Sequence, residues 1–291
     1  MRGNLLLLLA ALLWGSAFVA QRLGLDHMGS FAFNGVRTLV GALAIFPVSI
    51  GSRKRAGIKG IPKMTLVGGV VCGLVVCVAS NLQQAGIAHT SVSKAGFITA
   101  LYILFVPLIG LLLGKHVSKH FWIAVGIAMV GMYFLTSAGQ NHEGFSLSKG
   151  DFLVLLSAIM FAVHIMVIDH YSPMADGPTM ALLQFLVSGT ISVIVALCVG
   201  ESVGPTAIKG AIGAILYSGI LSCGAGYTLQ IVAQKDVNPV IGSLLMSLES
   251  VFAALAGWLV LHEQSTGMQV LGCALVFAAI IMAQLPGRKK S

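Results

Sequence analysis

The chain has few charged side chains, and this scarcity excludes an ordinary soluble protein. Lys, Arg, Asp and Glu make up 9% of its 291 residues, whereas a soluble globular domain carries about 25%. Hydrophobic residues make up 57% of the chain, and its mean hydropathy is +0.96. The apolar stretches lack the apolar/polar alternation of a transmembrane barrel, so the composition predicts an all-α integral membrane protein.

Motifs for catalysis and metal binding are also missing. The chain has no GxSxG elbow, no GxxxxGK[ST] loop and no HExxH motif, since His262-Glu263 lacks the second histidine. Its five cysteines lie within apolar stretches without CxxC spacing and are expected to be small core residues. The net charge of +8 comes from short basic clusters between apolar stretches, which indicates membrane topology rather than nucleic-acid binding. We therefore expect no enzyme activity, no metal, no cofactor and no nucleic-acid partner.

Apolar stretches long enough to cross a bilayer occur ten times. About 20 helical residues span about 30 Å of hydrocarbon, and the connections leave no room for a separate soluble domain. The first stretch resembles a signal peptide, but its apolar run continues past the small residues at which cleavage would occur, so we expect a helix there. The ten stretches are Leu5 to Gln21, Phe31 to Ile50, Met64 to Gly86, Ala95 to Leu113, Phe121 to Ser137, Phe152 to Ile168, Met180 to Val199, Ala211 to Ala233, Val240 to Leu261 and Met268 to Leu285.

The distribution of Lys and Arg predicts the orientation of these spans. If both termini lie in the cytoplasm, twelve Lys and Arg residues fall on the cytoplasmic side and four on the other, with Arg37 left inside a span. This excess satisfies the positive-inside rule. We therefore expect both termini to be cytoplasmic.

The second half of the sequence repeats the first. The repeat distance is 147 residues for most of the similar positions and 146 for others, such as Gly96 and Gly242. Because each half holds five spans, an odd number, the halves enter the membrane from opposite sides and form inverted repeats, which are typical of transporters that work by alternating access. At the distance of 147 the similar positions include Trp14 and Phe161, Arg37 and Gln184, and Leu82-Gln83 and Leu229-Gln230.

Polar side chains form a duplicated stripe on two of the predicted spans. Ser80 and Gln83 are three residues apart, as are Tyr227 and Gln230 at the repeat distance, and Cys223 extends the second stripe. Two interpretations remain equally open. The side chains either contact a solute or form hydrogen bonds between helices, which contribute about 1 kcal/mol or less each.

Two charged residues lie inside predicted spans. Glu249 is well inside the ninth, where an unpaired charge costs about 3 kcal/mol or more, so we favour a role in a wet cavity, in proton transfer or in binding. For Arg37 we favour a structural role, either in an ion pair with Glu249 or with its side chain extended toward the outer interface.

Four further residues have both structural and functional interpretations. His164 is expected to be a neutral, hydrogen-bonded core histidine, with substrate or proton binding as the second interpretation. Trp14 and Tyr102 are more often packing residues than binding residues. Pro107 is expected to kink or end a helix.

Several segments resemble the EamA-type repeats of the bacterial drug/metabolite transporter superfamily. They are LLLLAALLWGSAFVAQ, FNGVRTLVGAL, LQQAGIAHTSVSKAGFITALYILFVPLIGLLLG and SLLMSLESVFAALAGWLVLHE, although Ser250 follows Glu249 where many relatives have proline. The resemblance implies ten helices in two repeats, 1–140 and 150–287, in the bacterial cytoplasmic membrane. It also implies a central pathway lined chiefly by helices one, three, four, six, eight and nine, with Arg37 on a peripheral helix. On these helices the candidate substrate-binding residues are Trp14, Gln83, Tyr102, His164, Tyr227, Gln230 and Glu249.

Two hypotheses for the function follow. The first is a secondary transporter, often an exporter in this family, that moves a small organic solute such as an amino acid, a metabolite or a drug-like compound, with Glu249 as the candidate for proton coupling. The second is a non-transporting membrane protein, a sensor or assembly partner, whose polar residues only join helices. The expected partners are the lipid bilayer and a small solute, and the oligomeric state stays open between monomer and homodimer.

Overall fold

All regular elements are helices in the part of the chain that the computed structural model describes, residues 2–114, 117–137, 148–262 and 267–284. The predicted all-α fold is therefore confirmed. In chain order the elements are α1 (Arg2–Gly24), α2 (Ser30–Arg55), α3 (Lys63–Ile87), α4 (Val92–Ala100), α5 (Tyr102–Leu112), α6 (Lys119–Ser137), α7 (Lys149–Tyr171), the 3-10 turn η1 (Ser172–Met174), α8 (Gly177–Cys198), α9 (Pro205–Gly210), α10 (Ile212–Leu216), the π-helix η2 (Tyr217–Gly226), α11 (Tyr227–Ala233), α12 (Pro239–Met246), α13 (Glu249–Leu261) and α14 (Gly267–Gln284).

All ten predicted apolar stretches coincide with helices. Within the described residues, eight helical segments are long and apolar enough to cross a membrane, and two shorter apolar stretches, Phe121–Phe134 and Val270–Met282, lie in α6 and α14. The protein is thus a multi-pass membrane protein. Four of the crossing segments combine consecutive elements: α4 with α5, α7 with η1, α10 with η2 and α11, and α12 with α13.

Polar side chains fix the starts of several helices. Ser148 and Asp151 form a capping box at α7, in which each side chain accepts a hydrogen bond from the backbone N–H of the other residue. Asp176 caps α8 and Asn238 caps α12, and in both helices a proline follows within the first turn. Such caps satisfy backbone N–H groups that the helix itself leaves without partners.

Two of the crossing segments are interrupted at matching places. Leu101 separates α4 from α5, and Ser247 and Leu248 separate α12 from α13. The second interruption occurs without a proline. Pro107 lies inside α5 rather than at the break, and the helix continues past it to Leu112. The interruptions make Tyr102 and Glu249 the first residues of α5 and α13.

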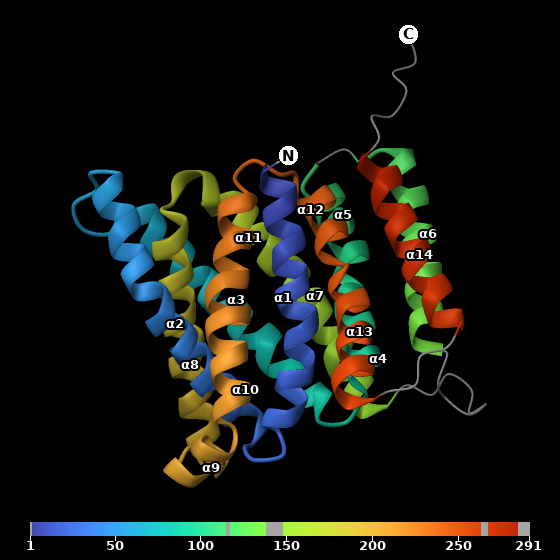
Figure 1. The fold of residues 1–291 in the computed structure, drawn as a ribbon. Coiled ribbons are helices and arrows are strands. Elements are labelled where there is room, and N and C mark those ends of the chain that lie inside the picture. The colour runs from blue at the N-terminus through green and yellow to red at the C-terminus, as the bar shows by residue number, and fades with distance from the viewer. Residues whose placement is uncertain (1, 115–116, 138–147, 263–266, 285–291) are drawn as a thin grey trace.

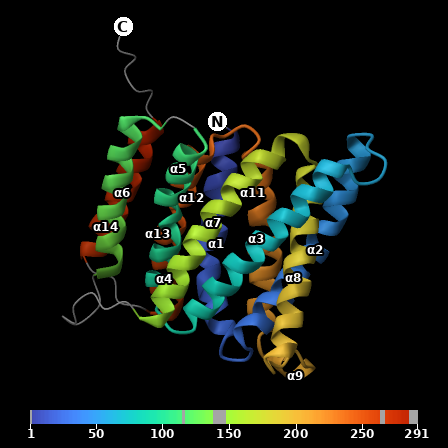
Figure 2. The same ribbon diagram turned by 180° about the vertical axis from the view of Figure 1, so that it is seen from behind.

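The helices form two groups that face each other. The front group contains α1, α10, η2, α11, α12 and α13, which pack against one another and face the viewer in Figure 1. The back group contains α3, α4, α5 and α7, which face the viewer in Figure 2. The pair α2 and α8 packs at one end of both groups, and the pair α6 and α14 lies at the other.

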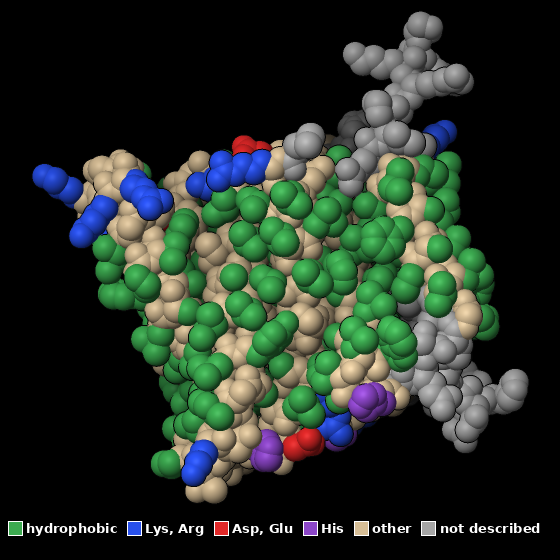
Figure 3. Space-filling model, in the orientation of Figure 1, with side chains coloured by type: hydrophobic (Ala, Val, Ile, Leu, Met, Phe, Trp, Pro, Cys, Tyr) green, Lys and Arg blue, Asp and Glu red, His purple; other side chains and the backbone are tan. Residues whose placement is uncertain are grey.

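The molecular surface has the pattern of a membrane protein. In Figure 3 hydrophobic side chains cover the middle of the molecule, and Lys and Arg gather along the upper edge. The start of α1 and the end of α14 lie on this same face in Figure 1. Lys115 and the basic residues Arg288, Lys289 and Lys290, which contribute to the predicted orientation, are outside the described residues.

Candidate binding cavity

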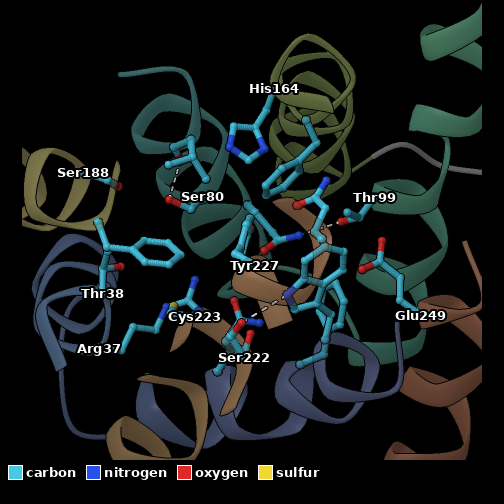
Figure 4. A pocket seen from close by; sticks show the side chains of 18 of the residues that line it. Arg37, Thr38, Ser80, Thr99, His164, Ser188, Ser222, Cys223, Tyr227 and Glu249 are labelled. Carbon is cyan, nitrogen blue, oxygen red and sulfur yellow. Dashed lines mark hydrogen bonds between the residues drawn. The ribbon is translucent and has the colours of Figure 1, made fainter. Parts of the chain in front are cut away.

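A cavity lies between the front and back groups and is bounded at one end by α2 and α8 (Figure 4). It has a volume of about 40 Å³, and because one water needs about 10–15 Å³ of such volume, it has room for a few water molecules. The residues that line it are Trp14, Phe18, Gln21, Arg37, Thr38, Val76, Ser80, Gln83, Thr99, Tyr102, Phe161, His164, Ile165, Phe185, Ser188, Ser222, Cys223, Tyr227, Gln230 and Glu249.

The structure brings all of the predicted substrate-binding residues to the wall of this cavity. The front group supplies four of them and the back group three. They are Trp14, Tyr227, Gln230 and Glu249 from the front group, and Gln83, Tyr102 and His164 from the back group. Side chains that are far apart in the sequence thus share one site, and their contact with a solute stays a prediction.

Trp14 is held by the irregular helix η2. Its indole Nε1–H donates a 3.2 Å hydrogen bond to the backbone carbonyl of Ser222. A Cβ on Gly226 would lie 2.6 Å from Trp14 Nε1, so only glycine at this position leaves room for the ring. The i→i+5 pattern of a π-helix shifts backbone groups from their usual positions. In η2 the Ser222 carbonyl is such a group, and it accepts the hydrogen bond from Trp14.

Aromatic rings form the middle of the cavity wall around Tyr227. The ring centroid of Tyr227 lies 4.8 Å from that of Trp14, 5.8 Å from that of His164 and 5.3 Å from that of Phe185. These distances fall in the range of about 4.5–7 Å in which tilted aromatic pairs attract each other. The cluster gives the site a rigid wall that is largely apolar.

The two glutamines of the duplicated stripe differ in their hydrogen bonds. Gln83 Nε2 donates to Thr99 Oγ1 at 3.0 Å. Gln230 is buried, and its Oε1 has no hydrogen-bond partner among the described residues. An orphaned acceptor in a membrane-embedded cavity costs free energy unless water or a solute donates to it.

His164 is a hydrogen-bonded core histidine that also lines the cavity, and its binding of a substrate or a proton stays a prediction. The side chain is buried and lies 3.0 Å, from Nε2 to Oε1, from Gln184, as expected of a hydrogen-bonded core histidine. The same ring also forms part of the cavity wall (Figure 4).

Glu249 has no counter-ion in the described part of the chain. Its side chain is buried beside that of Tyr102, and Glu249 Oε1 has no hydrogen-bond partner among the described residues. It lies in the first turn of α13, where the helix dipole favours a negative charge. An acidic group of this kind on a cavity wall is available for a proton or for a cationic group.

The position of Arg37 differs from the prediction. Arg37 does not reach the outer interface, and within the described residues it forms no ion pair. It is only 4% exposed and lies at the α2 end of the cavity. Its Nε and Nη2 both donate to Asn34 Oδ1, at 3.1 and 2.9 Å. Helix two is thus not merely peripheral, because Arg37 and Thr38 line the site.

The cavity wall also contains residues that the sequence did not single out, including Thr38, Phe185, Ser188 and Ser222. The repeat distance of 147 pairs Thr38 with Phe185. The residue next to Arg37 and its counterpart at this distance are therefore a pair that the sequence could have indicated.

Within the described residues, no group of three or more His, Cys, Asp or Glu side chains could hold a metal ion.

Comparison with known proteins gives one consistent family. The EamA-like transporter family matches the chain twice, over residues 1–137 and 148–284. An uncharacterized transporter of Archaeoglobus fulgidus is 30% identical over 284 residues, which cover 96% of this chain and 84% of that protein. The uncharacterized transporter YoaV of Bacillus subtilis is 22% identical over 93% of this chain and 92% of its own length.

Two further comparisons are more limited. One covers only part of the sequence, and the other shows similarity of the fold alone. The threonine/homoserine exporter RhtA of Escherichia coli is 29% identical over 58% of this chain and 56% of its own length. A solved structure described as a crystal structure of a protein has a TM-score of 0.77, with 17% identity over 97% of this chain and 96% of that chain. The helical architecture, the family match over both halves and the transporter relatives agree, and the chain belongs to the EamA-like transporter family as a membrane transporter rather than an enzyme.

Proposed function

We propose that the protein is a secondary transporter that moves a small organic solute across the cytoplasmic membrane by alternating access. The observation that carries this proposal is the composition of the cavity wall. The front and back groups contribute residues to it that correspond to each other at the repeat distance of 147. RhtA, a named exporter among the relatives, favours outward transport.

Pairs of residues at the repeat distance of 147 occupy the cavity wall together. In most pairs, one member belongs to the front group and the other to the back group. The pairs are Trp14 and Phe161, Phe18 and Ile165, Thr38 and Phe185, Val76 and Cys223, Ser80 and Tyr227, Gln83 and Gln230, and Tyr102 and Glu249. Such pairing is expected if two inverted repeats enclose one site on the axis that relates them.

Helix contacts outside the cavity support the same relation. A Cβ on Gly3 would lie 3.4 Å from the carbonyl oxygen of Ala233, and a Cβ on Gly150 would lie 2.7 Å from that of Gly86. Each residue of the first contact is 147 residues from its counterpart in the second. The start of α1 thus packs on the end of α11 as the start of α7 packs on the end of α3.

This relation favours ten spans arranged as two inverted five-helix repeats, 1–140 and 150–287. In this arrangement α6 and α14 are the fifth and tenth spans. The face of the molecule with more Lys and Arg in Figure 3 is then cytoplasmic, together with both termini.

The small size of the cavity bears on the mechanism. A volume of about 40 Å³ holds a few waters but not an organic solute with several heavy atoms. Solute entry therefore requires the front and back groups to move apart at one face of the membrane. Release at the other face requires the opposite movement, as alternating access supposes.

Within this site the polar and aromatic residues have separate roles. Gln83, Tyr227 and Gln230 form hydrogen bonds with the solute, and Trp14 and Tyr102 shape the wall. Glu249, supported by His164, supplies charge or exchanges a proton. The alternative of a non-transporting sensor or assembly partner predicts a tightly packed interior, which the cavity argues against.

Transport is tested with purified protein in liposomes. A thermal-shift screen of amino acids, nucleosides and organic acids first finds a solute that stabilises the protein, and flux of the radiolabelled solute is then measured without ATP. We expect saturable flux above that of protein-free liposomes. Replacement of Gln230 by Leu should lower the flux roughly two- to tenfold, the effect of one lost hydrogen bond.

Thr228→Val is the matched control, because Thr228 lies in the same helix but outside the cavity wall. It should leave the flux near that of the unmodified protein. Absence of flux for every stabilising solute would refute transport by this chain.

A further inference from the structure

Arg37 carries a buried positive charge that no described Asp or Glu neutralises. Its side chain is 4% exposed, and it forms no ion pair within the described residues. Glu249, the acidic residue on the same cavity wall, lies on the other side of Tyr227 in Figure 4. A charge inside a membrane protein is costly unless it has a partner of opposite sign. Arg37 therefore needs an anion that the described residues do not supply.

The hydrogen bonds that hold Arg37 involve neutral side chains. Asn34 Oδ1 accepts from Arg37 Nε and Nη2, while Asn34 Nδ2 donates to Ser80 Oγ at 3.1 Å and to Asn81 Oδ1 at 3.0 Å. This network fixes the guanidinium group but does not balance its charge. No residue in the described part of the chain accepts a hydrogen bond from Arg37 Nη1, so this donor remains for a ligand.

A second donor on the same side of the cavity has no partner. Ser188 of α8 is 1% exposed, and its hydroxyl makes no hydrogen bond within the described residues. Ser188 and Arg37 both line the cavity and lie on the same side of it in Figure 4. Helices α2 and α8 pack closely here, since a Cβ on Gly189 would lie 3.1 Å from the backbone nitrogen of Leu39. A guanidinium N–H and a serine O–H thus border one space, and both can donate to an anion.

The size of the cavity and the single charge of Arg37 favour a small monovalent anion. The volume of about 40 Å³ has room for a few water molecules, and a chloride ion is only a little larger than one water molecule. Organic anions with several heavy atoms exceed this space while the front and back groups are closed. A water molecule fits as well, but it leaves the charge of Arg37 unbalanced. Chloride is the abundant ion that meets both conditions.

We propose that Arg37 and Ser188 bind a chloride ion at the α2 and α8 end of the cavity. The ion neutralises the guanidinium group and accepts a hydrogen bond from the Ser188 hydroxyl. Because one donor comes from α2 and the other from α8, the ion joins these two helices. This site is separate from the residues proposed to contact the transported solute, which include neither Arg37 nor Ser188.

Chloride binding is tested by thermal shift on the purified protein in detergent. Sodium chloride replaces sodium gluconate at constant ionic strength, so that screening of surface charges stays the same. Gluconate is too large for the cavity. An ion that binds only the folded protein raises its apparent melting temperature as the ion concentration increases. We expect a saturable increase with chloride and with bromide.

Variants of the two donors should weaken this response to different extents. Arg37→Gln removes the charge and should weaken chloride binding about tenfold or more, whereas Arg37→Lys should keep part of the affinity because its charge remains. Ser188→Ala should weaken binding about two- to tenfold, the effect of one lost hydrogen bond. In gluconate, Ser188→Ala should melt at the same temperature as the unmodified protein or higher, because it removes a buried hydroxyl without a partner. A purely structural defect would lower that temperature instead.

Two matched controls should keep the full response to chloride. The first is Arg22→Gln, since the Arg22 side chain is 43% exposed. The second is Ser157→Ala, because Ser157 is a buried serine outside the cavity wall whose hydroxyl donates to the Val154 carbonyl.

The anomalous signal of bromide in crystals of the protein locates the ion directly, and we expect a peak beside Arg37 and Ser188. If Arg37→Gln does not fold, Arg37→Lys and Ser188→Ala test the same site. The proposal is overturned if chloride stabilises the protein no more than gluconate does. It is also overturned if the Arg37 and Ser188 variants respond to chloride as the unmodified protein does, or if bromide binds only elsewhere. None of these measurements requires transport, so the site can fail while the proposed function stands.

Discussion

At the scale of a single residue, we propose that Glu249 links solute binding to protons. Its carboxyl group is buried on the cavity wall without a counter-ion in the described part of the chain, so it is neutralised either by a proton or by a cationic group of the solute. The other titratable groups on the same wall are Arg37, Tyr102, His164, Cys223 and Tyr227. If the proton and the solute compete for one carboxylate, the rate of transport depends on pH.

Replacement of Glu249 by Gln removes this competition, because an amide does not titrate. We expect the variant to transport more slowly, with a rate that varies less with pH than that of the unmodified protein. Solute flux from liposomes buffered between about pH 5 and pH 8 is the measurement. Asp236→Asn, at an exposed position, should keep the original pH profile. An unchanged profile in Glu249→Gln would exclude Glu249 from proton coupling.

The limits of sequence analysis at this scale are clearest for the two charged residues. Glu249 was identified because a carboxylate deep in an apolar run is rare and costly. Arg37 was expected on a peripheral helix because the family resemblance implied it, with its side chain either paired with Glu249 or extended toward the outer interface. Its true environment depends on Asn34, Asn81 and Ser192, which come from three helices. Contacts between distant helices leave no signal in the local sequence.

At the scale of one element, η2 shapes the site through its irregular backbone. The sequence predicted a span over Ala211 to Ala233, and hydropathy alone supports that prediction. Hydropathy does not distinguish an α-helix from a π-helix, because it depends on composition and not on the hydrogen-bond pattern of the backbone. Trp14 fits against this irregular backbone, with its Nε1–H bonded to the Ser222 carbonyl and its ring against Gly226.

Replacement of Gly226 by Ala should disrupt this fit. The added Cβ would lie 2.6 Å from Trp14 Nε1, so the indole ring must move away from Ser222. We expect a loss of about 1–3 kcal/mol in stability from overpacking, seen as a lower apparent melting temperature in detergent, together with weaker solute binding.

Gly213→Ala in the neighbouring α10 is the control, because no heavy atom lies within 4 Å of its added Cβ. It should leave stability unchanged or raise it by up to about 1 kcal/mol through better helix propensity. Equal melting temperatures for the two variants would contradict the packing of Trp14 described above.

At the scale of the whole molecule, the two groups that we propose to move differ from the two halves of the sequence. The front group combines α1 with α10 to α13, and the back group combines α7 with α3 to α5, so each half lends its first helix to the other. Similar residues at a repeat distance of 147 predicted the duplication. They did not predict this exchange, because it depends on which helix faces pack together.

A disulfide between the groups should stop transport. In a variant without the native cysteines, Gly96→Cys and Ala253→Cys join α4 of the back group to α13 of the front group. A Cβ on Gly96 lies 2.8 Å from that of Ala253, so a small separation of the helices gives disulfide geometry. We expect oxidation to abolish flux and a reducing agent to restore it.

The control joins two residues within the front group. Gly3→Cys and Val237→Cys have Cβ atoms 4.0 Å apart, within the usual range of about 3.5–4.5 Å for a disulfide. Oxidation should leave their flux intact. Undiminished flux across an oxidised 96–253 bridge would show that these groups do not separate at that contact.

The π-helix also records how the two repeats came to differ. Gly73 packs on Val187 and the carbonyl oxygen of Gln184, and Gly219 packs in the same way on Val40 and the carbonyl oxygen of Arg37. These glycines are 146 residues apart, whereas Ser80 and Tyr227, just beyond, are 147 apart. On the proposed duplication, η2 therefore holds one amino acid that α3 lacks. A single inserted codon, accommodated by a wider helical turn, would have turned the Ser222 carbonyl toward Trp14. The counterpart of Trp14 is Phe161, whose ring has no N–H and so makes no such hydrogen bond.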